Sequence, residues 1–218
     1  MTTRSEQSTI PALPSRAPAR ALVPGLAVIV AAAVQGDGAL ITAAHRGASP
    51  VSVEQLSFPW AGATAVTTSL LWAVTQLLLV WGLLAFARSG AAGSRAGRVG
   101  GRLAVAGAVL YVVAHALSLV GYDAALDDPI AVAVVTCFGV GTLLTAVGLV
   151  LAGVATLRSN VWSGWRRYPP LVLGIWMVAM MPLQFTAALP LAVGVYAVAS
   201  MALGAALLVE SLARASYP

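Results

Sequence analysis

Long apolar runs alternate with short polar segments along almost the whole chain. The apolar runs have expected bounds of about 21–44, 61–87, 103–121, 129–157, 170–187 and 190–210. Most reach about 20 residues, the length that an α-helix needs to cross the hydrocarbon core of a bilayer. Because they are continuously apolar and do not alternate with polar residues, they predict helices and not barrel strands. We therefore expect an all-α integral membrane bundle of six transmembrane helices, occupying about residues 21–212.

The end of the chain leaves the number of spans open. Its last apolar stretch, residues 171–209, is too long for one span, and Pro182 and Pro190 interrupt it. Proline removes a backbone donor and ends or kinks a helix, so the stretch favours two spans with a tight turn around 187–190. In the alternative, the chain has five spans and this region forms one span plus a re-entrant piece.

The composition agrees with lipid as the solvent. Of the 218 residues, 60% are hydrophobic and 9% are charged, whereas a soluble domain has about 25% charged residues. The net charge of +5 does not indicate nucleic-acid binding, because the arginines lie in short segments between the spans, where they set orientation. Cys137 is the one cysteine and lies inside an expected span, which excludes a disulfide and a multi-cysteine metal site.

The arginines predict the orientation of the bundle. The segment 88–102 holds four arginines and no acid. With both termini in the cytoplasm, eleven of the twelve arginines fall on the cytoplasmic side and only Arg46 falls outside, as the positive-inside rule requires. The cytoplasmic arginine-rich loops are also expected to contact anionic lipids. All the basic residues are arginine, a usage typical of high-GC bacteria, so we expect a multi-pass protein of the bacterial plasma membrane.

The N-terminal segment precedes the first apolar run. Residues 1–20 are polar and contain three prolines, so they predict a disordered cytoplasmic tail. A cleaved signal peptide is the alternative, with Ala31–Ala33 supplying small residues. The long basic region, and apolar character that resumes after Gly38, favour a first span that is retained.

Four polar residues inside the expected spans are candidates for chemistry. Asp37 and His115 are ionisable, and an ionisable group in a bilayer is costly enough to be a functional candidate by default. Tyr111 lies four residues before His115 on one helix face, and Gln184 reaches a similar depth in the fifth span. Together they predict an outward-facing polar cavity that binds a small solute or moves a proton, with Asp37 and His115 titrating as a coupled pair. Two alternatives stay open: hydrogen bonds between helices that fix packing, and an Asp37 that reaches interfacial water.

Sequence motifs for catalysis are not visible. There is no HExxH, no GxSxG and no phosphate-binding loop, and only one histidine lies in a span, so a haem held by two histidines is not expected. We therefore expect no catalytic residue, metal or cofactor. The leading expectation is a non-enzymatic membrane component that acts through packing or a partner protein. The alternative is a small-solute or proton-coupled carrier, for which 218 residues is short unless the chain forms a homo-oligomer.

Three short motifs carry a resemblance to a known group of proteins. They are Ser57-Phe58-Pro59-Trp60, Ala87-Arg88-Ser89-Gly90 and Trp162-Ser163-Gly164-Trp165-Arg166-Arg167. With these motifs the chain resembles uncharacterised small multi-pass inner-membrane proteins of high-GC bacteria. The resemblance covers most of the chain and implies a membrane location. It implies no activity, and it carries no catalytic residue over to this sequence.

Overall fold

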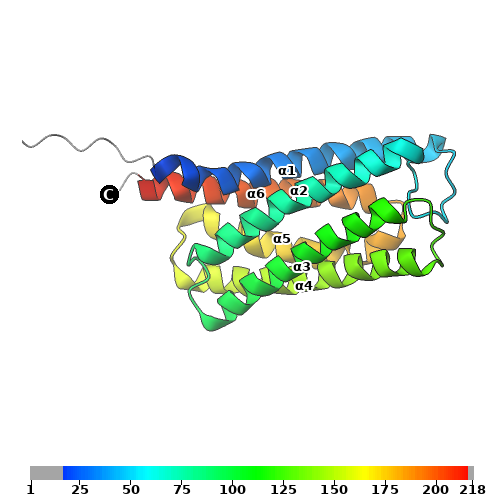
Figure 1. Cartoon of the computed structure of the whole chain (residues 1–218). Helices are drawn as coiled ribbons and strands as arrows, with labels where there is room; N and C mark the ends of the chain where they lie inside the picture. The colour runs from blue at the N-terminus through cyan, green and yellow to red at the C-terminus, as the bar shows by residue number, and fades with distance from the viewer. Residues whose placement is uncertain (1–16, 216–218) are drawn as a thin grey trace, which may run out of the picture.

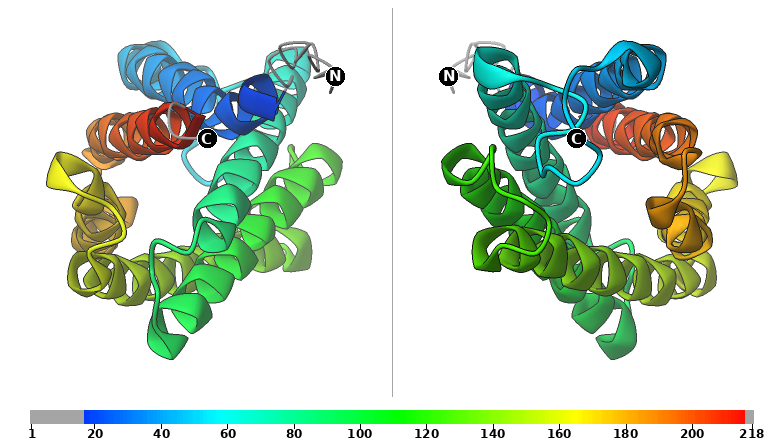
Figure 2. Two further views of the ribbon diagram at one scale, coloured as in Figure 1. Left: turned by 90° about the vertical axis from the view of Figure 1, so that its left-hand side faces the viewer. Right: turned by 90° about the vertical axis from the view of Figure 1, so that its right-hand side faces the viewer.

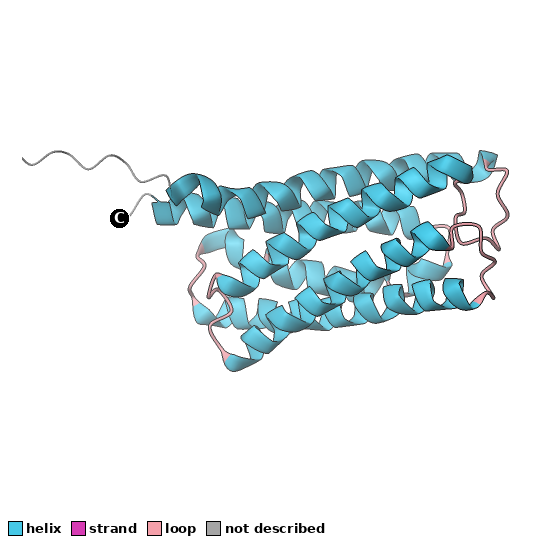
Figure 3. Cartoon of the chain, viewed as in Figure 1, coloured by secondary structure: helices cyan, strands magenta, loops and turns pink. Residues whose placement is uncertain are grey.

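The chain folds into a bundle of long α-helices joined by short connections (Figures 1 and 3). The computed structural model describes residues 17–215, so the expected disordered tail lies mostly outside the described residues. Within that range the α-helices are α1 (Ala17–His45), α2 (Gly62–Arg88), α3 (Arg95–Val120), α4 (Pro129–Ser159), α5 (Pro169–Met180) and α6 (Leu189–Ala215). The described residues form no strand, and the all-helical part of the prediction is confirmed.

Five of the helices are long and apolar enough to cross a membrane. At about 1.5 Å per residue, their 26 to 31 residues extend about 40 Å or more, beyond the 30 Å hydrocarbon core. Their outward faces carry large exposed apolar side chains, for example Leu70 on α2, Val132 on α4 and Val198 on α6. Such surfaces belong in contact with lipid, and the chain has the features of a multi-pass membrane protein.

The sixth helix, α5, has only 12 residues. It ends at Met180 because Pro182 lacks the N–H that would continue the helix. The short 3₁₀ helix η3 (Pro182–Phe185) follows, and α6 begins at Leu189 with a second proline in its first turn. Figure 1 shows α5 between α4 and α6, and it runs along the bundle in the direction opposite to α4.

The helices form a closed ring, which is clearest along the bundle axis (Figure 2). Each helix packs against the next one in the chain, and α6 packs against α1. Glycines bring the backbones close at these contacts. A Cβ built on Gly148 of α4 would lie 2.4 Å from the backbone nitrogen of Ala104 on α3, and one built on Gly25 of α1 would lie 2.8 Å from that of Leu208 on α6. A side chain at either position would force its two helices apart.

The two ends of the bundle differ in charge. One end of the bundle contains the start of α1, the end of α6, and the α2–α3 and α4–α5 connections (Figure 1). Every arginine of residues 17–215 except Arg46 lies toward this end. We call this the arginine-rich end. The opposite, acidic end consists of the loops over residues 46–61 and 121–128, which carry Glu54 and three aspartates. These loops are joined by backbone hydrogen bonds from Leu56 N to Ala124 O (3.0 Å) and from Leu126 N to Glu54 O (2.8 Å).

Two helices begin earlier than the apolar pattern indicates. The helix α3 starts at Arg95, eight residues before the expected span, so three arginines of the segment 88–102 lie on α3, and the fourth, Arg88, ends α2. Ser94 caps this start by accepting a hydrogen bond from Gly97 N at 3.0 Å. The helix α1 starts at Ala17, four residues before the expected span, because alanines favour helix and Pro18 is tolerated in a first turn. Apolar runs mark the membrane core, but capping and propensity set where a helix begins.

Candidate functional site

Two of the four candidate residues, Tyr111 and Gln184, meet at Thr142. The Tyr111 hydroxyl and Thr142 Oγ1 are 2.6 Å apart, and Gln184 Nε2 donates to the same Oγ1 at 3.4 Å. Thr142 in turn donates to Phe138 O at 2.8 Å. The cluster therefore joins α3, α4 and η3 through one hydroxyl group. Gln184 lies in η3, the 3₁₀ helix that follows the end of α5, and its side chain reaches across to Thr142 of α4.

His115 lies near this cluster but is enclosed by aromatic rings. Its ring stacks with Trp72 of α2 at a centroid distance of 6.2 Å and meets the edge of Phe138 of α4 at 4.9 Å. Phe138 also contacts Tyr111, with ring centroids 5.8 Å apart. Among the described residues no hydrogen bond or ion pair is made by the His115 side chain. The structure thus brings Tyr111, His115 and Gln184 into one region, with His115 held by ring packing.

Asp37 points away from that region. Its side chain is exposed on the outside of α1, on the same stripe as Val30 (54% exposed) and Ile41 (58% exposed). These residues are spaced by seven and four positions, so they share one face of the helix. No hydrogen bond or ion pair joins Asp37 to His115 or to any other described residue. Asp37 and His115 therefore do not contact each other in this structure, and the hypothesis that they titrate as a coupled pair stays a prediction.

Gln35, not Asp37, is the inward-facing polar residue of α1. It is 1% exposed, and its Nε2 donates to Thr75 Oγ1 of α2 at 3.1 Å. Residues two positions apart lie on nearly opposite sides of a helix, so an inward Gln35 requires an outward Asp37. The sequence carried a signal for this, because the buried residues Val28, Ala31, Ala32, Gln35 and Ala39 recur at three- and four-residue spacing.

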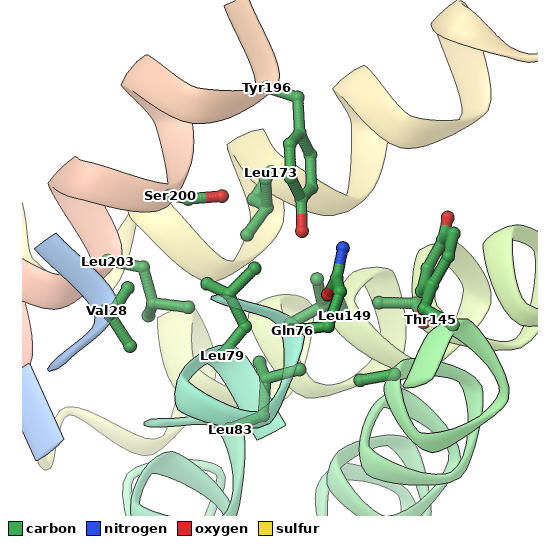
Figure 4. A pocket seen from close by; sticks show the side chains of 12 residues that line it. Val28, Gln76, Leu79, Leu83, Thr145, Leu149, Leu173, Tyr196, Ser200 and Leu203 are labelled. Carbon is green, nitrogen blue, oxygen red and sulfur yellow. The ribbon is translucent and has the colours of Figure 1, made fainter. Parts of the chain in front are cut away.

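A small cavity lies at the centre of the ring, with a lining that is mostly apolar (Figure 4). Its volume is about 10 Å³, which is about the space that one water occupies. The polar side chains that line it are Gln76, Tyr111, Thr145, Tyr196 and Ser200, and the remaining lining residues are apolar. In Figure 4 the Tyr196 hydroxyl and the Gln76 amide point toward one another, and Ser200 Oγ is buried without a hydrogen-bond partner in the described chain.

Tyr196 and Ser200 were not among the residues that the sequence analysis singled out. Both lie on the inner stripe of α6, four residues apart, and Leu203 and Leu207 continue that stripe. The spacing alone would have placed them inward once α6 was known to close the ring. Within residues 17–215, no three His, Cys, Asp or Glu side chains gather as metal ligands would. The interior therefore offers hydroxyl and amide groups for hydrogen bonding.

Comparisons of this chain with protein-family models, with curated proteins and with solved structures gave no match.

Proposed function

We propose that the protein is a non-enzymatic component of the bacterial plasma membrane that acts by binding a partner membrane protein through α1. In this proposal the chain has six spans, with α5 and η3 together forming the fifth, and both termini lie in the cytoplasm. The arginine-rich end supports this orientation, since arginines collect on the cytoplasmic side of membrane proteins. The observation that carries the proposed function is the outward position of Asp37.

Within residues 17–215 the Asp37 carboxyl has no hydrogen-bond or ion-pair partner, and it lies on an otherwise apolar, outward-facing stripe. Eight residues separate it from the end of α1 at His45, which is about 12 Å along the helix axis. An ionisable residue within a span costs about 2.5–3.5 kcal/mol on insertion scales, and such residues almost always face a protein interior. A neighbouring transmembrane helix that carries a cationic or hydrogen-bond-donating side chain at this depth would remove that cost.

The partner is expected to be a different protein and not a second copy. A two-fold dimer pairs the same surface of both subunits, so pairing through this stripe would place two Asp37 carboxyl groups against each other. Like charges in close contact disfavour one another's ionised form. A complementary donor on another chain satisfies Asp37 without that conflict.

The test is whether a second polypeptide depends on Asp37. The full chain would be extracted with its surrounding lipid, without detergent exchange, and examined by native mass spectrometry beside Asp37→Leu and a matched control, Glu54→Gln, which removes an acid from the loop at the acidic end. We expect a stoichiometric second polypeptide that is retained in the control and lost in Asp37→Leu. Its retention in Asp37→Leu, its absence from the unaltered protein, or a homo-oligomer that depends on Asp37 would each contradict the proposal.

A second candidate, a proton or small-solute carrier, is favoured by the central cavity. The five polar side chains that line it lie on four different helices, α2, α3, α4 and α6, so relative movement of the helices would change its size. At about 10 Å³ it admits no solute larger than water. Proteoliposomes loaded with a pH-sensitive dye and given a potassium diffusion potential would report proton flux. Flux that is lost in Ser200→Ala with Gln76→Leu, but retained in Asp37→Leu, would favour the carrier over the partner-binding function.

A further inference from the structure

We propose that the arginine-rich end carries a binding site for the phosphate group of an anionic phospholipid. The site is a cavity of about 220 Å³ between the start of α1, the end of α2 and the end of α6. It is much larger than the central cavity, and far larger than one water requires. Because it lies at the other end of α1 from Asp37, it does not depend on the proposed partner protein.

The charges around this cavity leave a positive excess. Glu210 contacts two guanidinium groups, Arg166 at 2.8 Å and Arg214 at 3.1 Å. Arg88, from the last turn of α2, also lines the cavity, and no hydrogen bond or ion pair joins its side chain to another residue within 17–215. The charged side chains that line the cavity are two arginines and one carboxylate, a net charge of +1 that an anion would offset.

The Arg214 guanidinium is held in place with donors remaining. Its Nε donates to Glu210 Oε1 at 3.1 Å, and one of its terminal nitrogens donates to Ser89 O at 2.9 Å. A guanidinium has five N–H donors in a planar fork that suits phosphate oxygens. Its side chain is 54% exposed, so the remaining donors are accessible. An arginine already fixed at its base loses less conformational freedom when it binds a ligand.

Trp162 also lines the cavity, and its indole N–H has no hydrogen-bond acceptor among the described residues. Its side chain is 1% exposed and packs on Phe86 at a ring-centroid distance of 5.5 Å. Its Nε1 is buried, and it has no hydrogen-bond partner in the described chain. A buried donor without an acceptor costs free energy. A ligand in the adjoining cavity would remove this cost if a movement of the Trp162 ring exposed Nε1 to one of its oxygens.

The remaining walls indicate a lipid and not a free anion. Pro24, Ala85 and Leu207 line the cavity on its apolar side. Trp81 of α2, one turn before Ala85 on the same helix face and 45% exposed, continues this apolar surface toward the middle of the bundle. A ligand with a phosphate beside the arginines and an acyl chain along α2 matches both parts. Basic pockets between helices at the cytoplasmic side of membrane proteins are known to hold such headgroups.

Replacing the arginines that line the cavity should weaken its affinity for an anionic phospholipid. Each basic residue near an anionic lipid surface contributes about 1 kcal/mol, which is about fivefold in a dissociation constant. Arg88→Gln should therefore weaken binding of phosphatidylglycerol about fivefold. Arg88→Gln combined with Arg214→Gln should weaken it about 25-fold.

The experiment is native mass spectrometry of the purified full chain, titrated with phosphatidylglycerol, phosphatidylcholine or inorganic phosphate. The matched control is Arg95→Gln with Arg102→Gln, which removes the same charge at the same end but outside the cavity. We expect one phosphatidylglycerol to be lost from the double cavity variant and kept in the control, with phosphatidylcholine alike in all. Equal losses in both double variants, or displacement of phosphatidylglycerol by millimolar inorganic phosphate, would overturn the proposal. Because the Arg88 side chain makes no hydrogen bond or ion pair within the described residues, Arg88→Gln alone still measures the effect of the charge if the double variant misfolds.

Discussion

Gln35 and Thr75 connect α1 to α2 through a hydrogen bond of 3.1 Å from Gln35 Nε2 to Thr75 Oγ1. Thr75 uses its own proton to donate to Trp72 O at 2.9 Å, so its oxygen is an acceptor for Gln35. Both residues are buried, at 1% and 3% exposure, and Gln35 Oε1 has no partner among the described residues. The two residues therefore differ in what their removal leaves behind.

Thr75→Val should destabilise the protein more than Gln35→Met does. Loss of the threonine oxygen leaves the whole Gln35 amide buried without a partner, at a cost of about 1–3 kcal/mol. Gln35→Met removes the donor and the unpartnered acceptor together and keeps the side-chain volume, so its effect should be under about 1 kcal/mol. Equilibrium unfolding in mixed micelles, followed by circular dichroism, measures both. A Gln35→Met variant that loses as much stability as Thr75→Val would show that the amide has another role.

Gly148→Ala should separate α3 from α4. The added Cβ would lie 2.4 Å from Ala104 N and 2.6 Å from Gly100 O, and overpacking of this kind costs about 1–3 kcal/mol. The matched control is Gly139→Ala on the same helix, where a Cβ meets nothing within 4 Å. Thermal melting of the helical signal should fall for Gly148→Ala and stay level or rise for Gly139→Ala. Equal melting temperatures would mean that the two helices do not pack this closely.

The Tyr111–Thr142 contact should contribute a modest coupling energy. A double-variant cycle of Tyr111→Phe and Thr142→Val measures this energy. Hydrogen bonds between membrane helices contribute about 0.6 kcal/mol on average and about 1.7 kcal/mol at most. The short distance of 2.6 Å places this pair toward the upper part of that range. Unfolding free energies of the two single variants, the double variant and the unaltered protein give the value. A coupling near zero would mean that the two hydroxyl groups are satisfied separately.

Cysteine labelling tests the proposed orientation. In a Cys137→Ser background, Val53→Cys places a thiol at the acidic end and Val161→Cys places one at the arginine-rich end, at positions 67% and 47% exposed. A membrane-impermeant maleimide added to intact cells should label Val53→Cys at once, but Val161→Cys only after the membrane is permeabilised. The opposite pattern would invert the topology.

The apolar pattern predicted the helical class and most helix positions, but it could not say which way each polar residue faces. Asp37 stood out because it is charged, whereas the packing of α1 is set by its small residues, and that stripe contains Gln35. The prolines indicated two helices at the end of the chain, but α5 ends at Met180, seven residues before the expected bound of 187, because Pro182 lacks the N–H that would continue it. The contact of Gln184 with Thr142 depends on where α5 ends relative to α4, which no local signal contains. The cavities are likewise formed by helices distant in sequence.

The pairing of the first helix with the last has a consequence for how the protein is made. The backbone of α1 at Gly25 packs on Gly204 and Leu208 of α6, and α6 leaves the ribosome after the other five described α-helices. Until it does, the glycine face of α1 has no permanent neighbour, and the ring stays open between α1 and α5. Closure of the ring therefore waits until α6 has been made, and a chain that stops before residue 189 lacks the surface on which α1 rests.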